Sequence, residues 1–589
     1  MNPSLSSCAA LAALLAASST SLFAQASVKG TWESPVELQI DGVHAALLPT
    51  GKVIYLPHRY SPSGLTTAAV FDPLQPGGVL YSALPRNFFC GGHSQLRDGR
   101  MLFLGGETSK GAGGLQHTAY FDPWTETWTQ LQNLKRRRWY PSAILMGDGR
   151  VGAFGGMSEA GDDDPDNTIE YYDPDLGTWA LAGGQNIPGQ FEEAYNRLHL
   201  LPDGKVFQSG HLPQTYLYDP VAKTWAFVDT TNLGKARGDG GSVRLQDGRI
   251  LIVGGQDTLT IFKSAEIIDL DQPSPQWTSV ADMSVQRAFF STVLLPDGNV
   301  LVVGGDETSG GLAWTPELFD PATLTWSQMA PHQVRRGYHS TAIVLPDARV
   351  LCSGGEGQKG PGLYEESAEF EIWNPYYLFK SPRPVITSAP AEAGYGQQVQ
   401  LGYTSSVPVS HVVLHRSGSS THSFNYNQIS VPVDFDSVGA GTVSFTVPNN
   451  PNALPPGYYL AFLMNADGVP SVAPFVRIDE PSGPTLTATG LVAGGSATLS
   501  VAGATPGGLV AIAYSLTGPG PLQVGLACGS VQIELGLPVL LGAPSADPAG
   551  DASIPGIAVP PGISGLPIWF DALDLTDCSS TNGVAAVIG

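Results

Sequence analysis

A repeated pattern of short apolar runs between polar turns dominates residues 27–378. Each unit begins with a turn, usually of the Asp-Gly type, and most units end in a glycine pair. The turns begin at Pro49, Asp98, Asp148, Asp203, Asp247, Asp297 and Asp347. The glycine pairs lie at 105–106, 155–156, 254–255, 304–305 and 354–355, whereas the fourth unit has only Ser209-Gly210 and the first has no pair. Asp-Gly turns that need positive φ, followed by short apolar runs, predict β-hairpins.

A second signature, an Asp-Pro pair followed by a tryptophan, recurs later in four of the units. The pairs begin at Asp122, Asp173, Asp219 and Asp320, and the tryptophans are Trp128, Trp179, Trp225 and Trp326. The period of about 50 residues is the kelch spacing. The seven turns therefore predict a seven-bladed kelch-type β-propeller with four strands per blade and a central channel. An array of β-sandwiches would not explain the repeat.

The repeat stops near Asn374-Pro375, and two further β-domains are expected after it. Residues 379–480 carry alternating strand patterns such as Val412–Leu414 and Tyr458–Phe462, which suit an immunoglobulin-like sandwich. A Pro-Ser-Gly-Pro linker then leads into residues 481–589, which predict a second, small β-sandwich of unknown role. The predicted fold class is therefore all-β throughout.

Composition agrees with many short strands and narrows the range of partners. Hydrophobic residues make up 42% and charged residues 14% of the 589 residues, with 71 Gly and 48 Pro. Such a chain needs several domains and is rich in turns. The formal net charge of −23 disfavours nucleic acid or an anionic membrane as a partner. The sequence contains no basic stripe and no nucleic-acid motif.

The first 26 residues resemble a secretory signal. An apolar run over Cys8–Ala17 is followed by Ala24-Gln25-Ala26, a small-x-small cleavage site, although no Lys or Arg precedes the run. We expect a secreted, extracellular or periplasmic protein. The alternative is an N-terminal membrane anchor, for which the run is short, and no later segment predicts a membrane span.

Four cysteines follow the predicted signal: Cys90, Cys352, Cys528 and Cys578. In an oxidising compartment, Cys528 and Cys578 are expected to form a disulfide in the last domain. Cys352 lies in an apolar run and predicts a buried free thiol. Cys90 is left without a thiol partner.

Four chemically active residues precede the apolar runs at corresponding places in the repeat: Cys90, Tyr140 and the adjacent Tyr338-His339. The segment that enters the innermost strand of a blade lies at a mouth of the channel, so the register brings these side chains together. The sixth unit has Phe289-Phe290 at this place. The position therefore does not require a polar residue, and its polar occupants call for an explanation.

The motifs around these residues resemble those of the copper-radical oxidase family of galactose oxidase and glyoxal oxidase. The resemblance covers roughly residues 30–480. The motifs, in order, are Phe88-Phe89-Cys90-Gly91, Arg138-Trp139-Tyr140-Pro141-Ser142, Gly337-Tyr338-His339-Ser340, Thr421-His422-Ser423-Phe424-Asn425 and Met464–Ser471. Each motif alone is weak, and their joint occurrence in this order is specific.

The resemblance implies a role for each of five residues. Tyr140 is the equatorial copper ligand, joined through its ring to the sulfur of Cys90. Tyr338 is the axial tyrosine that takes the substrate proton. His339 and His422 are the imidazole ligands, and in the family the loop that carries the counterpart of His422 threads from the sandwich into the propeller channel.

The implied cofactors are one copper ion and the Cys90–Tyr140 thioether radical. Imidazoles and phenolate oxygens suit Cu(II). Oxidation of an alcohol or aldehyde removes two electrons, of which copper takes one and the Tyr140 ring the other, and O₂ then reoxidises the site to give H₂O₂. No flavin or nicotinamide is implied. His411 and His415 are rival ligands that lack the Thr-x-Ser context of His422.

Two departures from galactose oxidase affect the expected substrate. The tryptophan that stacks on the crosslinked tyrosine is matched here by Ser158, so a shield is absent or comes from elsewhere. The galactose-contacting positions are not matched, and Arg237 is the one candidate pocket residue. We therefore expect glyoxal-type aldehydes or small primary alcohols as substrates. The alternative function is a non-catalytic kelch module that binds glycan or another extracellular protein.

Overall fold

A computed structural model describes the chain from residue 25 onward, apart from residues 59–66, 76, 109–112, 159–166, 189–194, 307–310, 361–362, 480–484, 518–520, 526–529, 548–549, 577–578 and 582–583. The predicted signal lies almost wholly outside the described residues, and so do Cys528 and Cys578. The chain divides into two compact units, Met1–Asp479 and Glu480–Gly589.

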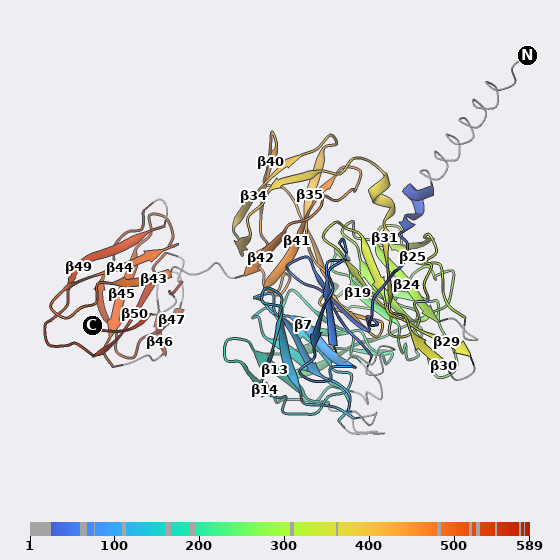
Figure 1. Ribbon diagram of the computed structural model, residues 1–589, viewed down its shortest axis with the longest axis horizontal. Coiled ribbons are helices and arrows are strands. Elements are labelled where there is room, and N and C mark those ends of the chain that lie inside the picture. The colour runs from blue at the N-terminus through green and yellow to red at the C-terminus, as the bar shows by residue number, and fades with distance from the viewer. Residues whose placement is uncertain are drawn as a thin grey trace, which may run out of the picture. The chain divides into compact units, whose positions relative to one another are not determined.

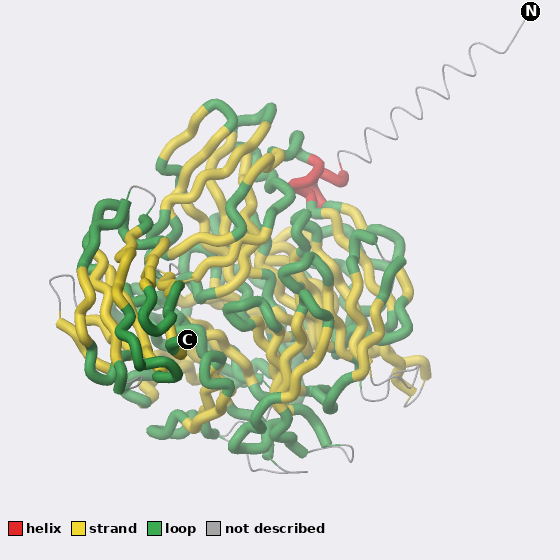
Figure 2. Tube along the Cα trace, turned by 60° about the vertical axis from the view of Figure 1, so that its left-hand side comes forward, coloured by secondary structure: helices red, strands yellow, loops and turns green. Residues whose placement is uncertain are grey.

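The described residues confirm an all-β protein (Figures 1 and 2). Helix is confined, within the part of the chain that the structure describes, to residues 25–29 and the 3₁₀ turn η1 (Tyr376–Phe379). None of the described helices has the length and apolar character needed to cross a membrane. Strands joined by tight turns therefore carry the architecture, as the turn pattern predicts.

Five four-stranded antiparallel sheets follow one another along the first unit, each made of consecutive strands. They are β7 (Gly91–Gln95), β8 (Met101–Gly105), β9 (Thr118–Asp122) and β10 (Thr127–Gln130); β11 (Ser142–Leu145), β12 (Val151–Phe154), β13 (Ile169–Asp173) and β14 (Thr178–Leu181); β15 (Leu198–Leu200), β16 (Val206–Gln208), β17 (Gln214–Asp219) and β18 (Thr224–Thr230); β19 (Gly241–Arg244), β20 (Ile250–Val253), β21 (Ala265–Ile268) and β22 (Thr278–Ser279); and β23 (Ala288–Leu294), β24 (Val300–Asp306), β25 (Glu317–Asp320) and β26 (Thr325–Gln328).

Two further sheets complete the repeat region and join distant parts of the chain. In one, β27 (Thr341–Val344), β28 (Val350–Ser353) and β31 (Glu369–Asn374) pair with the N-terminal strands β1 (Thr31–Trp32) and β2 (Val36–Glu37). In the other, β3 (His44–Leu47), β4 (Val53–Leu56), β5 (Thr67–Phe71) and β6 (Leu80–Ala83) are extended by the hairpin β36 (Ser419–Thr421) and β37 (Phe424–Tyr426). A β29 (Glu356–Gly360)–β30 (Leu363–Glu366) hairpin projects between β28 and β31.

The first strands of most of these sheets lie next to one another. β7 lies beside β11, β11 beside β15, β19 beside β23, β23 beside β27, and β27 beside β3. The last sheet thereby meets the first.

Glycine pairs explain how neighbouring sheets approach so closely. A Cβ atom added at Gly105 would lie 2.5 Å from the carbonyl oxygen of Arg138, and one at Gly304 would lie 2.2 Å from that of Arg336. Both glycines have positive φ, which L side chains adopt only with strain. These two arginines, and two others at corresponding places in the repeat, each form a buried ion pair inside a sheet. The pairs are Arg138–Glu170, Arg237–Glu266, Arg287–Glu317 and Arg336–Glu371.

The rest of the first unit is a two-sheet sandwich with its own apolar core, which includes Leu401, Leu414 and Phe445. One sheet has the order β32 (Val385–Ser388), β34 (Gln398–Thr404), β40 (Thr442–Thr446) and β39 (Ser437–Gly439). The other has the order β33 (Glu392–Gly394), β42 (Phe475–Asp479), β41 (Gly457–Asn465), β35 (Val409–Arg416) and β38 (Ile429–Val433). The hairpin β36–β37 lies between β35 and β38 in the sequence, so the sandwich supplies it.

The second unit has a separate apolar core that includes Leu499, Ile512 and Phe570. Its sheets are β43 (Thr485–Thr489), β44 (Ser496–Ala502) and β49 (Ala552–Ala558); β48 (Val539–Gly542), β45 (Val510–Ser515), β50 (Pro567–Asp574) and β51 (Val584–Val587); and the pair β46 (Pro521–Gly525) and β47 (Ser530–Glu534).

Candidate metal centre

Six residues at one position of the repeat share a left-handed backbone conformation at or just before the first strand of their sheets. The φ angles of Cys90, Tyr140 and His339 are 59°, 60° and 66°. Tyr195, Asp239 and Phe289 hold the same position in the three intervening sheets, with φ angles of 58°, 50° and 61°. Non-glycine residues in this region are uncommon and mark constrained sites. The repeat therefore presents six side chains around one point.

The sandwich hairpin brings His422 to the same point. β36 pairs with β3, so that His44 lies opposite Thr421, and the hairpin also lies beside β7, β11, β23 and β27. Side-chain amides just after it fix its depth: the Leu145 N–H donates to Asn427 Oδ1 over 2.8 Å, and the Leu294 N–H donates to Gln428 Oε1 over 2.9 Å. His422 is thus held among the first strands of several sheets.

All five residues singled out from the sequence meet at this point. The hydroxyl oxygens of Tyr140 and Tyr338 are 3.1 Å apart, and Cys90 Sγ lies 3.4 Å from His422 Nε2. The rings of His339 and His422 are 4.5 Å apart between centroids, and the ring of Tyr338 stacks on that of His339 at 3.9 Å. Two imidazoles, two phenols and a thiol therefore share one compact centre.

Both histidines of the centre make a hydrogen bond through the Nδ1 atom of the ring. His339 Nδ1 is hydrogen-bonded to Glu366 Oε1, while the buried Nε2 atom has no hydrogen-bond partner among the described residues. His422 Nδ1 is 2.6 Å from the Thr421 hydroxyl. Metal-binding histidines are typically held in this way by a partner on the other ring nitrogen. The orphaned Nε2 atom of His339 therefore fits a metal ligand.

Burial keeps these groups uncharged in the absence of a cation. It lowers the pKa of His339 to about 3 and that of His422 well below its usual range. It raises the pKa values of Tyr140 and Tyr338 far above their ordinary value, and the neighbouring Cys90 raises both further. Burial also raises the pKa of Glu366 to about 8. A bound dication would favour neutral imidazole, as burial already does, and would reverse the preference of the tyrosines and of Glu366 by favouring phenolate and carboxylate. The donor set therefore fits Cu(II).

Two aromatic residues that the sequence analysis did not single out contact Tyr140. The indole of Trp139 stacks on the Tyr140 ring, with centroids 4.6 Å apart and 24° between the planes. The ring of Tyr195 meets Tyr140 edge-on at 5.2 Å, and its hydroxyl donates to the Gly91 carbonyl. The shield over Tyr140, which the Ser158 position does not supply, thus comes from the adjacent residue.

His58 is a further residue that the sequence reasoning missed. Ligand atoms of His58, His339 and Glu366 lie within 4.8 Å of one another, and His58 packs edge-on against Phe89. Glu366 lies at the end of β30, in a hairpin that no repeat pattern predicts.

The structure also bears on three other expectations from the sequence, with a different outcome for each. Arg237, the candidate pocket residue, is instead buried in its ion pair with Glu266 and donates to the Gly254 carbonyl; this expectation is corrected. Of the rival ligands, His415 is buried and pairs with Leu460 along β41, and His411 lies on the same strand β35. Cys352 is a buried free thiol, as predicted.

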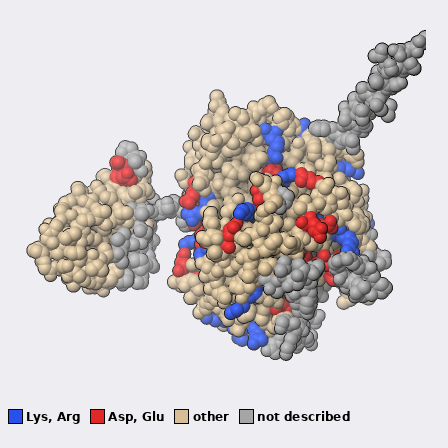
Figure 3. Space-filling view, in the orientation of Figure 1, with Lys and Arg blue, Asp and Glu red and all other residues tan. Residues whose placement is uncertain are grey.

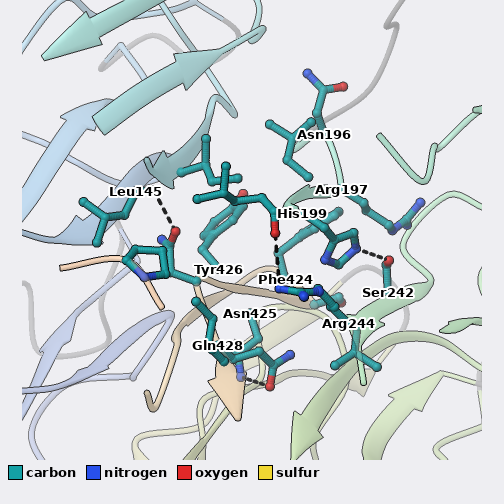
Figure 4. A pocket seen from close by; sticks show the side chains of 18 residues that line it. Leu145, Asn196, Arg197, His199, Ser242, Arg244, Phe424, Asn425, Tyr426 and Gln428 are labelled. Atoms are coloured by element: carbon teal, nitrogen blue, oxygen red, sulfur yellow. Dashed lines mark hydrogen bonds between the residues drawn. The ribbon is translucent and has the colours of Figure 1, made fainter. Parts of the chain in front are cut away.

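A hollow lies beside the residues that follow His422 in the hairpin segment (Figure 4). Phe424 and Tyr426 of β37 line it together with His199, Arg197 and Arg244. Tyr195 contacts both His422 and Phe424, so a layer of aromatic rings separates this hollow from the centre.

Comparisons with known proteins show which families this fold and this centre resemble. The galactose oxidase-like early set domain family matches residues 383–478, and the glyoxal oxidase N-terminus family matches residues 259–372. Both matches fall within the first unit.

Individual relatives agree with these matches. Galactose oxidase of Gibberella zeae is 27% identical, over 77% of this chain and 71% of that protein. Aldehyde oxidase GLOX of Vitis pseudoreticulata is 28% identical, over 78% of this chain and 98% of that protein. A solved structure of a fungal alcohol oxidase of the AA5 family, in complex with copper, superposes with a TM-score of 0.67 at 28% identity, covering 76% of this chain and 99% of that chain. The predicted resemblance to copper-radical oxidases is confirmed.

Proposed function

We propose that this protein is a secreted copper-radical oxidase that oxidises glyoxal-type aldehydes or small primary alcohols with O₂. An aldehyde, water and O₂ would give a carboxylic acid and H₂O₂, and a primary alcohol and O₂ would give an aldehyde and H₂O₂. The observation that carries the proposal is the meeting of Cys90, Tyr140, Tyr338, His339 and His422 at one point.

Tyr140, Tyr338, His339 and His422 would hold one copper ion, and Cys90 would be joined to the Tyr140 ring. When bound, the copper and the thioether-substituted ring would each take up one of the two electrons that leave the substrate. Packing of Cys90 against Tyr140 supports this pairing.

The residues around the centre have separate tasks in this proposal. Tyr338 is only partly buried, so its phenolic oxygen, deprotonated when it holds copper, would be placed to accept the hydroxyl proton of an alcohol or of a hydrated aldehyde. Trp139 covers one face of the Tyr140 ring and keeps water from it. Thr421 and Glu366 orient the two imidazoles through Nδ1.

We also propose that residues 27–378 form a seven-bladed kelch-type propeller, that residues 379–480 form an immunoglobulin-like sandwich that supplies His422, and that residues 481–589 form a second small sandwich. The side-by-side first strands support the propeller, and the hairpin β36–β37 supports the role of the sandwich. No nucleic-acid partner is proposed: on the face drawn in Figure 3, the described Lys and Arg residues form small groups interspersed with Asp and Glu.

The test is to load the purified chain with copper and to measure O₂ consumption and peroxide release with methylglyoxal and with a primary alcohol. Peptide mass should show Cys90 and Tyr140 linked, with the loss of two hydrogens and resistance to reduction. Failure to bind one copper ion per chain would contradict the proposal. A Cys90 that stays alkylatable after copper treatment, with no oxidase activity, would favour the alternative binding module.

A further inference from the structure

Three carboxylates border the partly exposed side of the metal centre: Asp239, Asp306 and Glu356, here called the acidic rim. Asp239 holds the repeat position equivalent to Tyr140 and His339. Asp306 ends β24, and a Cβ atom added at Gly337 would lie 2.6 Å from its Oδ1 atom. The Glu356 N–H donates to the Tyr338 carbonyl over 2.6 Å. Three sheets thus bring acids to the surroundings of Tyr338.

The rim lies on the side from which a substrate can reach the centre. All three rim residues are partly exposed, as are Tyr140 and Tyr338, whereas Cys90 and His422 are buried. The buried Nε2 atom of His339, a side chain only 4% exposed, has no hydrogen-bond partner among the described residues, and it is the atom that would hold the metal on this side of the centre.

Electrostatic interactions join the rim to the centre. After burial and Cys90, the carboxylates of Asp239 and Glu356 contribute to the raised pKa of Tyr338. Burial raises the pKa of Asp306 to about 6, with further contributions from Glu356 and Asp239.

We propose that the acidic rim makes the centre select uncharged or cationic substrates and reject those that carry a carboxylate; this inference rests on the proposed function. A concave site lined by one sign of charge lowers the local concentration of ions of the same sign. The carboxylate of an α-oxo acid would have to lie within a few bond lengths of its reacting carbon, and therefore close to the rim. A neutral aldehyde of the same size meets no such repulsion.

Methylglyoxal and glyoxylate test this selection, because they are small aldehydes of similar size that differ in charge. We expect kcat/KM for glyoxylate to be lower by about tenfold or more at low salt and to rise with ionic strength, since salt screens the repulsion. Asp239→Asn and Asp306→Asn should each raise the ratio of glyoxylate to methylglyoxal kcat/KM by about tenfold. Asp434→Asn, an exposed acid of the sandwich, is the matched control and should leave the ratio unchanged.

Azide binding to the copper-loaded chain, followed by its optical spectrum, gives a readout that does not need turnover. The two rim variants should bind azide about tenfold more tightly than the parent chain. Copper-dependent oxidation with a glyoxylate preference, or with ratios and azide affinities that neither salt nor the variants change, overturns the inference and leaves the proposed function standing. A chain that binds no copper overturns both.

Discussion

The indole of Trp139 lies almost parallel to the ring of Tyr140, with 4.6 Å between the ring centroids. A flat aromatic neighbour excludes water from the face of a ring and stabilises it by about 0.5–1.5 kcal/mol. Because the two residues are adjacent, the contact depends on the left-handed φ of Tyr140, which turns consecutive side chains to the same side.

Replacing this shield should shorten the life of the oxidised centre. In Trp139→Gly we expect the oxidised form of the copper-loaded protein to decay about three- to tenfold faster, in line with the energy of one aromatic stack. Trp139→Phe should retain part of the effect. Decay of the optical band after chemical oxidation measures it, and Trp128→Phe, in the outer strand β10, is the control. Equal decay rates in all variants would show that Trp139 does not protect the ring.

Glu366 should set the copper affinity through His339. Loss of a hydrogen-bonding partner of a metal-bound histidine typically lowers affinity by about 10–100-fold. Glu366→Gln still offers an oxygen to Nδ1 and should fall near the lower value, whereas Glu366→Ala should fall near the higher. Competition with a chelator measures the affinity, and Glu369→Gln, on β31, is the control. The hypothesis fails if Glu366→Ala binds copper as tightly as the parent chain.

Cys90→Ser should separate copper binding from the crosslink. The serine variant keeps both tyrosines and both histidines, so we expect one copper per chain but no linked Cys90–Tyr140 peptide, and oxidase activity below detection. Copper analysis, peptide mass and O₂ consumption measure the three outcomes. Cys352→Ala, which removes the buried thiol of β28, should form the crosslink normally. Full activity in Cys90→Ser would refute the role of the thiol.

Buried histidines should make the protein less stable in acid. Burial lowers the pKa values of His199 and His415 to about 3, whereas the unfolded chain takes up protons near 6.5. This contribution to the free energy of unfolding is fully present above pH 6.5 and is lost as the pH falls toward 3, by about 1.4 kcal/mol per pH unit for each histidine.

Melting temperatures of metal-free protein between pH 8 and pH 4 check this loss. His415→Phe should make the decline shallower, because the phenyl ring takes up no proton and Phe462 already packs beside it. His211→Asn, at a half-exposed position, serves as the comparison. A decline as steep in His415→Phe as in the parent chain would count against the argument.

The repeat made the sheets and much of the centre predictable. Asp-Gly turns and glycine pairs fix where each first strand begins, and so where Cys90, Tyr140 and His339 lie. The same spacing ahead of the glycine pairs, which located Phe289, would also have found Asp239. Glu366 was out of reach, because it belongs to the β29–β30 hairpin and its contact with His339 depends on tertiary packing. Trp139 was missed because a stack between adjacent residues requires a backbone angle that the sequence does not display.

The hairpin β36–β37 also determines when the centre can exist. His422 follows Cys90 by 332 residues, so during synthesis the repeat region leaves the ribosome well before its last imidazole does. A nascent chain that has folded only its first sheets has Cys90 and Tyr140, and one that has emerged through residue 378 also has Tyr338 and His339. Both still lack His422, the group that completes the donor set. Reactive redox chemistry would thereby be withheld until the polypeptide has grown past the sandwich hairpin and docked it, which makes cofactor formation a late step in the maturation of the protein.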